Sequence, residues 1–373
     1  MPRRRSLLIY GGRPLHIDWA IAFAAALVGF TVGMTGMGGG ALMTPILLIF
    51  FGINPTTAVS SDLVAAMVMK PVGGGVHVRR KTVQWDLVRW LCVGSIPMAF
   101  AGVFILHATG DNETVQNVTK ILLGVTLLLA AAAMVFKAWL QGRRSALARA
   151  GLRETLEPGG DIHVKIPLTI AVGALGGLLV GLTSVGSGSI IIVCLMLIYP
   201  QLRGAQLVGT DLVQAVPLVA SAAIAHIIVG DFELGLTVSI LIGGIPAVYL
   251  GARLSSRARD GVIRPALVFV LLASALKLLD VPTLLLGILL LVIALVGLPL
   301  WAAVDAAAFP ETIWNAAGLD REQWIHRLVM TAPIGVGFFL GIQYFRKVRP
   351  KLVGPVSDGG VLAPGVPTAV DGA

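Results

Sequence analysis

The sequence predicts an all-α polytopic membrane protein with two inverted-topology repeats, each containing a glycine-broken re-entrant hairpin. Of its 373 residues, 56% are hydrophobic and 13% are charged, whereas roughly 25% of the residues in a typical soluble protein are charged. A soluble fold of this size could not cover its surface with so few polar groups. Several apolar runs reach or approach the ~20 residues that span a bilayer as a helix.

Ten apolar segments, separated by polar loops, are the expected membrane elements. They fall near 17–52, 56–78, 87–107, 117–139, 166–199, 207–229, 235–252, 265–279, 282–304 and 328–345. The expected organisation is an N-terminal segment (1–16), transmembrane repeat 1 (17–139), a cytoplasmic linker (140–165), transmembrane repeat 2 (166–280), extra C-terminal membrane segments (281–345) and a disordered tail (346–373). The tail is rich in Gly, Pro and Val, a composition that does not bury a core.

The two halves of the chain repeat each other. The run Gly33–Ala41 matches Gly181–Ser189 at an offset of 148 residues, and the offset becomes 149 after a one-residue insertion. The later matches pair Asp62 with Asp211, His77 with His226, and Gly94–Pro97 with Gly243–Pro246. Skewed composition does not readily explain a paired Asp, His and Pro in one register, so we interpret the duplication as real.

Loop charges indicate that the two repeats are inverted. The loop after residue 78 is basic, whereas the equivalent loop of the second repeat contains Asp231 and Glu233 without Lys or Arg. Basic loops are cytoplasmic, and inverted repeats are common in secondary transporters. With the linker before residue 166 on the cytoplasmic side and the loop at 231–233 outside, the segment 207–229 supplies the one crossing needed. The segment 166–199 must therefore return to the side of the membrane from which it started. At 1.5 Å per residue it would extend ~50 Å as one helix, too long for a ~30 Å hydrocarbon core.

The net charge and the motif inventory exclude several other classes. The formal charge of +9 lacks the basic stripe with interleaved aromatics that is typical of nucleic-acid binding, so no nucleic-acid partner is expected. Cys92 and Cys194 lie in apolar segments and offer no disulfide or metal spacing. A partial dinucleotide fingerprint at Gly36 lacks the required strand and βαβ unit. With no Walker sequence, nucleophile elbow or metal pair, we predict no enzyme activity, no cofactor and no metal.

The paired glycine-rich runs are the candidate substrate site. Irregular backbone at membrane depth is tolerated where protein buries it or where it lines a cavity. A helix that begins after such a run presents N–H groups that suit a small anion. The alternative is tight helix packing through small residues. The candidate substrate-binding residues are Thr35, Gly36, Met37, Gly38, Gly39, Gly40, Thr183, Ser184, Gly186, Ser187, Gly188 and Ser189.

Polar residues within the next apolar segment of each repeat are candidates for coupling or for the substrate pathway. They are Asp62, Lys70, Asp211 and Gln214. Charges at membrane depth are costly and often mark ion or substrate pathways. The competing interpretation is that Asp62 and Asp211 cap helix N-termini. We interpret His77 and His226, which lie near predicted helix ends, as interfacial residues.

These motifs together resemble the TauE/SafE family of sulfite-exporter-like permeases, also called the toluene sulfonate uptake permease group. The resemblance covers roughly residues 17–280 and rests on the paired bends, the stretch Pro45–Gly52, the segment Val208–Leu212 and the paired Ile-Pro helices. It implies a multi-pass carrier for sulfite, sulfonates or related anions, with the glycine bends at the substrate site. The chain departs from the family at Asp62 and Asp211, where Ser or Asn is common, and in its extension 281–345.

We therefore expect a secondary transporter in the cytoplasmic (inner) membrane that moves a small organosulfur or sulfite-like anion. The alternatives are an anion channel, or a transporter of another small carboxylate or oxyanion with proton coupling. The expected partners are the anionic substrate and the lipid bilayer, and a homo-oligomer is left open. Anion export gains ~2.3 kcal/mol per charge per 100 mV from an inside-negative potential, so uptake needs a co-transported cation.

Overall fold

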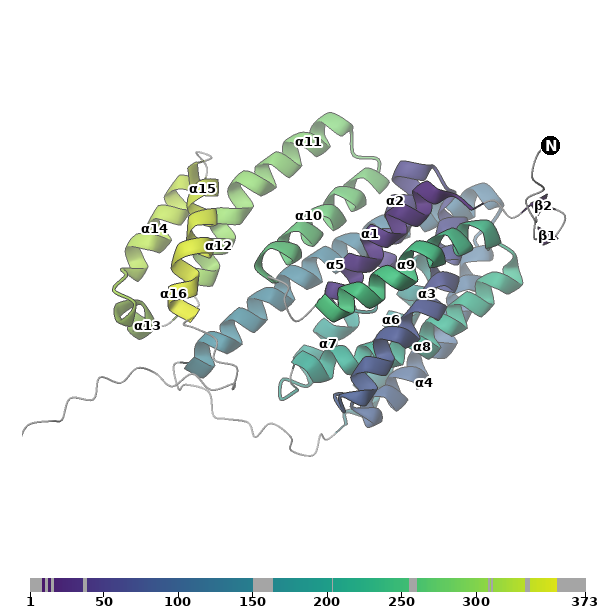
Figure 1. The fold of residues 1–373 in the computed structure, drawn as a ribbon, viewed down its shortest axis with the longest axis horizontal. Helices are drawn as coiled ribbons and strands as arrows, with labels where there is room; N and C mark the ends of the chain where they lie inside the picture. Colours follow the sequence, from purple (N-terminus) through teal and green to yellow (C-terminus); the bar gives the residue numbers. More distant parts are fainter. Residues whose placement is uncertain are drawn as a thin grey trace, which may run out of the picture. The chain divides into compact units, whose positions relative to one another are not determined.

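The computed structural model describes residues 9–10, 13–14, 17–35, 39–149, 164–202, 204–254, 260–307, 309, 311–332 and 336–353. Apart from two short antiparallel strands, β1 (Ile9–Tyr10) and β2 (Arg13–Pro14), the regular structure of this part is helical (Figure 1). Six of the described helices are long and apolar enough to cross a membrane. The predicted class, an all-α polytopic membrane protein, is confirmed.

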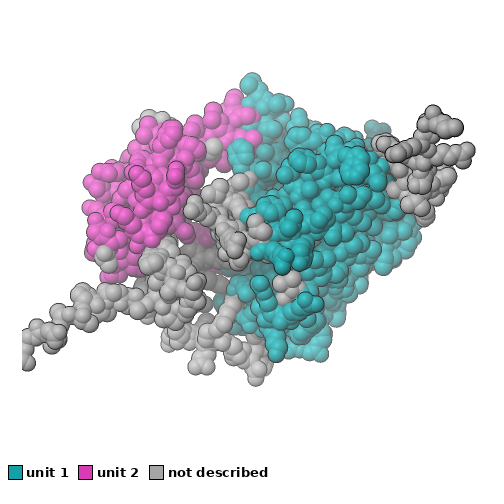
Figure 2. Space-filling model, in the orientation of Figure 1, with its two compact units in different colours: residues 1–137, 156–286 teal, residues 138–155, 287–373 magenta. Residues whose placement is uncertain are grey.

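The helices fall into two compact units, shown in different colours in Figure 2. Unit 1 comprises residues 1–137 and 156–286, and unit 2 comprises residues 138–155 and 287–373. Unit 1 is built from α1 (Trp19–Thr35), α2 (Gly40–Phe51), α3 (Pro55–Arg79), α4 (Trp85–His107), most of α5 (Asn112–Arg149), α6 (Ile166–Thr183), α7 (Ile190–Ile198), α8 (Gly204–Val229), α9 (Leu234–Leu254) and α10 (Asp260–Leu278).

Helix pairing in unit 1 is symmetrical under exchange of the two predicted repeats. Helix α1 packs mainly against α9, and its counterpart α6 packs mainly against α4 (Figure 1). Helix α3 packs against its own counterpart α8, and the α3–α9 contact is matched by the α4–α8 contact. This pattern is what a duplicated unit with a pseudo-two-fold relationship produces, and it supports the predicted repeat.

Two hydrogen bonds follow the same exchange. The amide of Gln84 donates to Thr210 Oγ1 at 3.0 Å, and the amide of Glu233 donates to Ser61 Oγ at 3.3 Å. Glu233 lies 149 positions after Gln84, and Thr210 lies 149 positions after Ser61, which is the offset between the two repeats in the sequence. The orientation of the repeats relative to a membrane remains a prediction.

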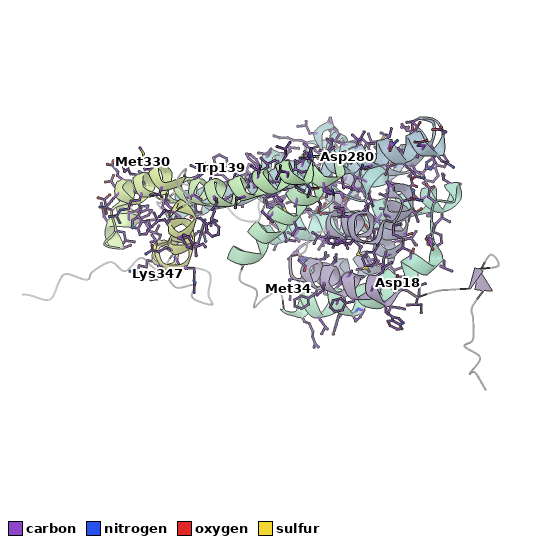
Figure 3. The ribbon with its side chains drawn as sticks, turned by 90° about the horizontal axis from the view of Figure 1, so that it is seen from above. Asp18, Met34, Trp139, Asp280, Met330 and Lys347 are labelled. Atoms are coloured by element: carbon purple, nitrogen blue, oxygen red, sulfur yellow. The ribbon has the colours of Figure 1, made fainter. Side chains whose placement is uncertain are left out.

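The start of α1 is tied to α9 by Asp18. Its Oδ1 accepts hydrogen bonds from the amides of Ala20 (2.8 Å) and Ile21 (3.3 Å), which is how an Asp N-cap satisfies the first amides of a helix. Its own amide donates to Ser239 Oγ of α9 at 3.0 Å. Figure 3 shows Asp18 and Met34 at the two ends of α1.

Glycines allow α6 and α4 to touch backbone to backbone. A Cβ at Gly173, Gly177 or Gly181 of α6 would overlap a carbonyl group of α4, that of Ser95 in the case of Gly177. Glycines of α9 meet α1 in the same way: a Cβ at Gly243 would overlap the Ala22 carbonyl. Small residues at helix interfaces are the usual way in which membrane helices approach closely.

We expect Gly177→Val to destabilise the protein by about 1–3 kcal/mol or more, because α6 must move away from α4 to admit the side chain. Thermal unfolding in detergent measures this. Gly75→Ala is the matched control, since a Cβ at Gly75 of α3 meets no atom within 4 Å, and alanine favours a helix over glycine by about 1 kcal/mol. Equal unfolding midpoints for the two variants would contradict the packing assignment.

Unit 2 contains the last part of α11 (Thr283–Val292), the π-helix η2 (Ile293–Gly297), α12 (Leu298–Ala307), α13 (Glu311–Ala316), α14 (Arg321–Thr331), α15 (Val336–Gln343), the π-helix η4 (Tyr344–Val348) and α16 (Arg349–Val353). Its core surrounds the fully buried Trp314 and Tyr344. Asp305 Oδ2 accepts hydrogen bonds from Tyr344 (2.8 Å) and Arg349 (2.9 Å).

Two expectations for the C-terminal region differ from the structure. The apolar segment 328–345 is divided between α14 and α15, and the sequence between them contains Pro333, which cannot continue a helical hydrogen-bond ladder. The predicted disordered tail begins at residue 346, but helix continues to Val353 because Tyr344, Val348 and Leu352 form one buried stripe. Residues 354–373 lie outside the described residues.

Candidate functional site

The predicted break in the second repeat is present. Helix α6 ends at Thr183 and α7 begins at Ile190. Between them Ser184 (φ 59°), Gly186 (φ 133°) and Gly188 (φ 89°) adopt left-handed or related conformations that suit glycine and end a helix. Ser184, Ser187 and Ser189 are all less than 10% exposed, so protein surrounds the break. The return of this hairpin to the same membrane face remains a prediction.

The first repeat also divides its apolar segment into two helices. Helix α1 ends at Thr35 and α2 begins at Gly40, where Gly39 precedes it and accepts the amides of Leu42 and Met43. Gly36, Met37 and Gly38, which were predicted to bind substrate, lie outside the described residues, as does the Thr35 side chain. The structure therefore describes the two helices on either side of the predicted break, α1 to Thr35 and α2 from Gly40.

The start of α2 meets the break of the second repeat. A Cβ at Gly40 would overlap the Ser184 carbonyl, so only glycine permits this approach. The buried carboxylate of Asp62, on α3, binds both sides of the contact: its Oδ2 accepts hydrogen bonds from Ser184 Oγ (2.6 Å) and from Thr44 Oγ1 of α2 (3.0 Å). Asp62 thus fastens the break of the second repeat to the helix that follows the break of the first.

Lys70 joins the same region from two turns further along α3. Its Nζ donates to Ser187 Oγ in the second break at 2.8 Å. The ammonium group also interacts electrostatically with Asp62 and Asp211. The structure therefore brings together the predicted residues Gly40, Ser184 and Ser187 with Asp62 and Lys70, and it places a positive charge against a helix break.

Asp211 and Gln214 approach the break from α8. Asp211 is 1% exposed, takes a backbone hydrogen bond from Gly188 and interacts electrostatically with Lys70 and Lys137. Gln214 is fully buried, and its Nε2 donates to Ser95 Oγ of α4 at 3.0 Å. The second break is thus contacted from two helices: Asp62 and Lys70 of α3 bind Ser184 and Ser187, and the Asp211 carboxylate of α8 binds Gly188.

The helix-cap interpretation of the two aspartates is wrong. Asp62 lies about two turns inside α3, which begins at Pro55, and Asp211 lies about two turns inside α8, which begins at Gly204. Both carboxylates are less than 5% exposed. They are interior polar residues in contact with the second break.

Other predicted residues have local roles. Thr183 Oγ1 donates to the Leu179 carbonyl at 2.6 Å and accepts from the Val185 amide at 3.2 Å, so it shapes the end of α6. The Ser189 carbonyl accepts the amide of Val193 in the first turn of α7. Sequence reasoning missed Thr44 and Ser95. The signal available was a single hydroxyl in an otherwise apolar helix segment, which points to a buried partner.

A second polar cluster surrounds Asp231, in the loop between α8 and α9. His107 Nε2 lies 2.8 Å from Asp231 Oδ2, and His226 Nδ1 lies 3.8 Å from the same oxygen. His226 was expected at an interface, but it is fully buried and its Nε2 pairs with the Gly181 carbonyl at 3.0 Å. Burial alone would raise the pKa of Asp231, but its interactions with the nearby His226 and His107 outweigh burial and hold the pKa below its ordinary value.

We expect Asp231→Asn to lower the free energy of unfolding by about 1–2 kcal/mol at neutral pH, because a charged hydrogen bond is lost. Because the pKa of Asp231 is lower in the folded state, its carboxylate stabilises the fold at a pH above the unfolded-state pKa of about 4. This stabilisation is lost as the pH falls through the folded-state pKa. The difference from wild type should therefore shrink below about pH 4. Thermal unfolding across pH measures it, with Glu233→Gln of the same loop as the control. A difference that is constant down to pH ~3 would contradict the pairing.

The fold defines a polytopic membrane protein, and comparisons with known proteins identify it as a membrane transporter. The chain belongs to the family described as Sulfite exporter TauE/SafE, whose family model matches residues 21–278. This match ends at the end of α10, so α11 to α16 lie outside it.

Relatives agree with this class. The chain is 35% identical over 260 residues, 69% of its length and 98% of the relative's, to the "Probable membrane transporter protein YjnA" of Bacillus subtilis (strain 168). It is 22% identical over 242 residues, 65% of its length and 91% of the relative's, to the "Probable membrane transporter protein YdhB" of the same organism. No solved structure is similar enough to count as a match.

Proposed function

We propose that the protein is a secondary transporter, not an enzyme, that moves a small sulfite-like or organosulfur anion across the cytoplasmic membrane. The anion binds at the contact between the two helix breaks. The observation that carries this proposal is the Lys70 ammonium held against Ser187 in the second break. An ammonium has three donors, and the bond to Ser187 uses one of them.

The surroundings of Lys70 support recognition of a small oxyanion. A hydroxyl and an ammonium donate charge-assisted hydrogen bonds to an oxyanion, and a buried site strengthens them. Glycines at the breaks let backbone approach a ligand closely. Asp62 has its hydroxyl partners within the protein and fixes the position of the second break rather than contacting the anion.

Flux of sulfite in proteoliposomes tests this proposal. We expect saturable uptake of radiolabelled sulfite, with counterflow when unlabelled sulfite is inside. Counterflow measured with the membrane potential clamped at zero separates a carrier from a channel, because without a potential a channel passes label only down the gradient of the label itself. Absence of flux for sulfite and for methanesulfonate would overturn the substrate class, and flux without saturation or counterflow would replace the carrier by an anion channel.

A further inference from the structure

We propose that Asp211 and Gln214 bind one monovalent cation, which the transporter takes up together with its anion. The coupling rests on the proposed function, whereas the cation site does not. The site lies on α8, where the two side chains are one helical turn apart and therefore share a face. The ligand is a single positive charge accepted by two oxygen atoms, either a sodium ion or a proton.

Two unpartnered buried oxygens point to this ligand. Among the residues that the structure describes, Asp211 Oδ1 and Gln214 Oε1 have no hydrogen-bond partner, although the two residues are 1% and 0% exposed. With the Gln214 amide oriented so that its Nε2 donates to Ser95 Oγ, both atoms are acceptors, and neither can satisfy the other while Asp211 is ionised. An unsatisfied buried acceptor is costly, and each such group in a folded protein calls for a missing partner. A proton on Asp211 Oδ1, or a sodium ion between the oxygens, supplies it.

The equivalent carboxylate in the first repeat, Asp62, has hydrogen-bond donors from the protein itself. Asp62 lies 149 positions earlier and receives two hydroxyl donors, from Ser184 and Thr44. Asp211 instead has a backbone hydrogen bond from Gly188, and its Oδ1 has no partner in the described part of the chain. The position equivalent to Gln214 is Ala65, so the second acceptor is particular to this repeat. The two pseudo-symmetric repeats have therefore diverged: the acceptor oxygen of Asp62 is paired within the protein, whereas Asp211 and Gln214 each present an acceptor to a ligand.

Charge balance links the cation to the anion. Among the described residues, the charged groups that interact with Asp211 are Lys70 of α3 and Lys137 of α5, and Lys70 also interacts with Asp62. With all four ionised their charges sum to zero, so a bound monovalent anion leaves a net charge of −1 in a buried site. An isolated buried charge is strongly unfavourable. One cation at Asp211 and Gln214 restores neutrality, so the anion and the cation each favour binding of the other.

Thermal unfolding of the purified full-length protein in detergent tests the cation site. In one arm sodium chloride replaces N-methyl-D-glucamine chloride at fixed ionic strength and pH, and in the other the pH is lowered without sodium. We expect one arm to raise the unfolding midpoint of wild type relative to Asp211→Asn by about 3–5 °C at a tenfold excess over the dissociation constant. A response to sodium identifies sodium, and a response to pH alone identifies a proton.

Two further variants keep the test decisive. Gln214→Glu adds a carboxylate at the same position, and we expect it to increase the cation response, even if Asp211→Asn does not fold. Asp280→Asn, a change at an exposed acid paired with Lys120 at 2.7 Å, is the control and should respond as wild type does. If neither sodium nor pH separates wild type from Asp211→Asn, or if Gln214→Glu weakens the response, the cation site is wrong.

Flux then distinguishes failure of the coupling from failure of the proposed function. In proteoliposomes with the identified cation gradient, we expect sulfite to accumulate in wild type and only to equilibrate in Asp211→Asn. Sulfite flux that ignores the gradient would overturn the coupling while leaving the transporter intact. A cation response in thermal unfolding without any sulfite flux would support the site and overturn the sulfite proposal instead.

Discussion

Replacing Lys70 with methionine should lower sulfite uptake by about 100-fold, because truncating one partner of a buried charged contact costs 2–5 kcal/mol and each 1.4 kcal/mol is a factor of ten. The methionine keeps the length and apolar stem of the side chain but cannot donate to Ser187 or to an anion. Initial rates in proteoliposomes, normalised to reconstituted protein, measure the effect.

Two variants frame this result. Lys70→Arg retains the positive charge and donors, so it should keep a larger share of uptake than Lys70→Met. Lys120→Met removes an ammonium that pairs with the exposed Asp280, and uptake should stay near the wild-type rate. If Lys70→Met is folded and transports within threefold of wild type, Lys70 does not contact the anion.

Replacing Asp62 with leucine should lower the free energy of unfolding by about 3–5 kcal/mol, because removing one partner of a buried charged pair leaves the other uncompensated. Ser184 and Thr44 lose their acceptor, and Lys70 loses one of its two carboxylate neighbours. The contact between the two breaks depends on these bonds, so transport should be lost as well. Chemical or thermal unfolding in matched detergent measures the change.

The conservative variant separates charge from shape. Asp62→Asn keeps an oxygen acceptor for the two hydroxyls, so it should be less damaging to stability than Asp62→Leu. Asp86→Leu, at an exposed acid in the first turn of α4, is the control for introducing leucine and should have little effect. Equal stability of Asp62→Leu and wild type would show that Asp62 does not hold the breaks together.

The break between α6 and α7 could be predicted from the sequence because its signals are local. The segment 166–199 is too long for one membrane crossing, and the run of Gly and Ser at 184–189 offers residues that accept positive φ. Helix starts could have been read better as well. Pro55 suits the first position of a helix, and that signal would have placed Asp62 inside α3 rather than at its cap.

The partners of the charged residues could not be predicted, because they come from elements far apart in the sequence. Ser184 is separated from Asp62 by 122 residues, and Ser187 from Lys70 by 117. The sequence repeat indicates which residues occupy equivalent positions, but it does not determine their hydrogen-bond partners, since the equivalent Asp62 and Asp211 have different ones. The partner of His226, the Gly181 carbonyl of α6, could not be predicted for the same reason.

The central claim is that a small anion binds where the two breaks meet. Anomalous diffraction from crystals grown with selenite, a heavier analogue of sulfite, tests it most directly. We predict one selenium peak within contact distance of Lys70 Nζ and Ser187, absent from Lys70→Met crystals. A selenium peak elsewhere in the protein that persists in Lys70→Met, or no peak under conditions in which selenite inhibits sulfite flux, would contradict the account.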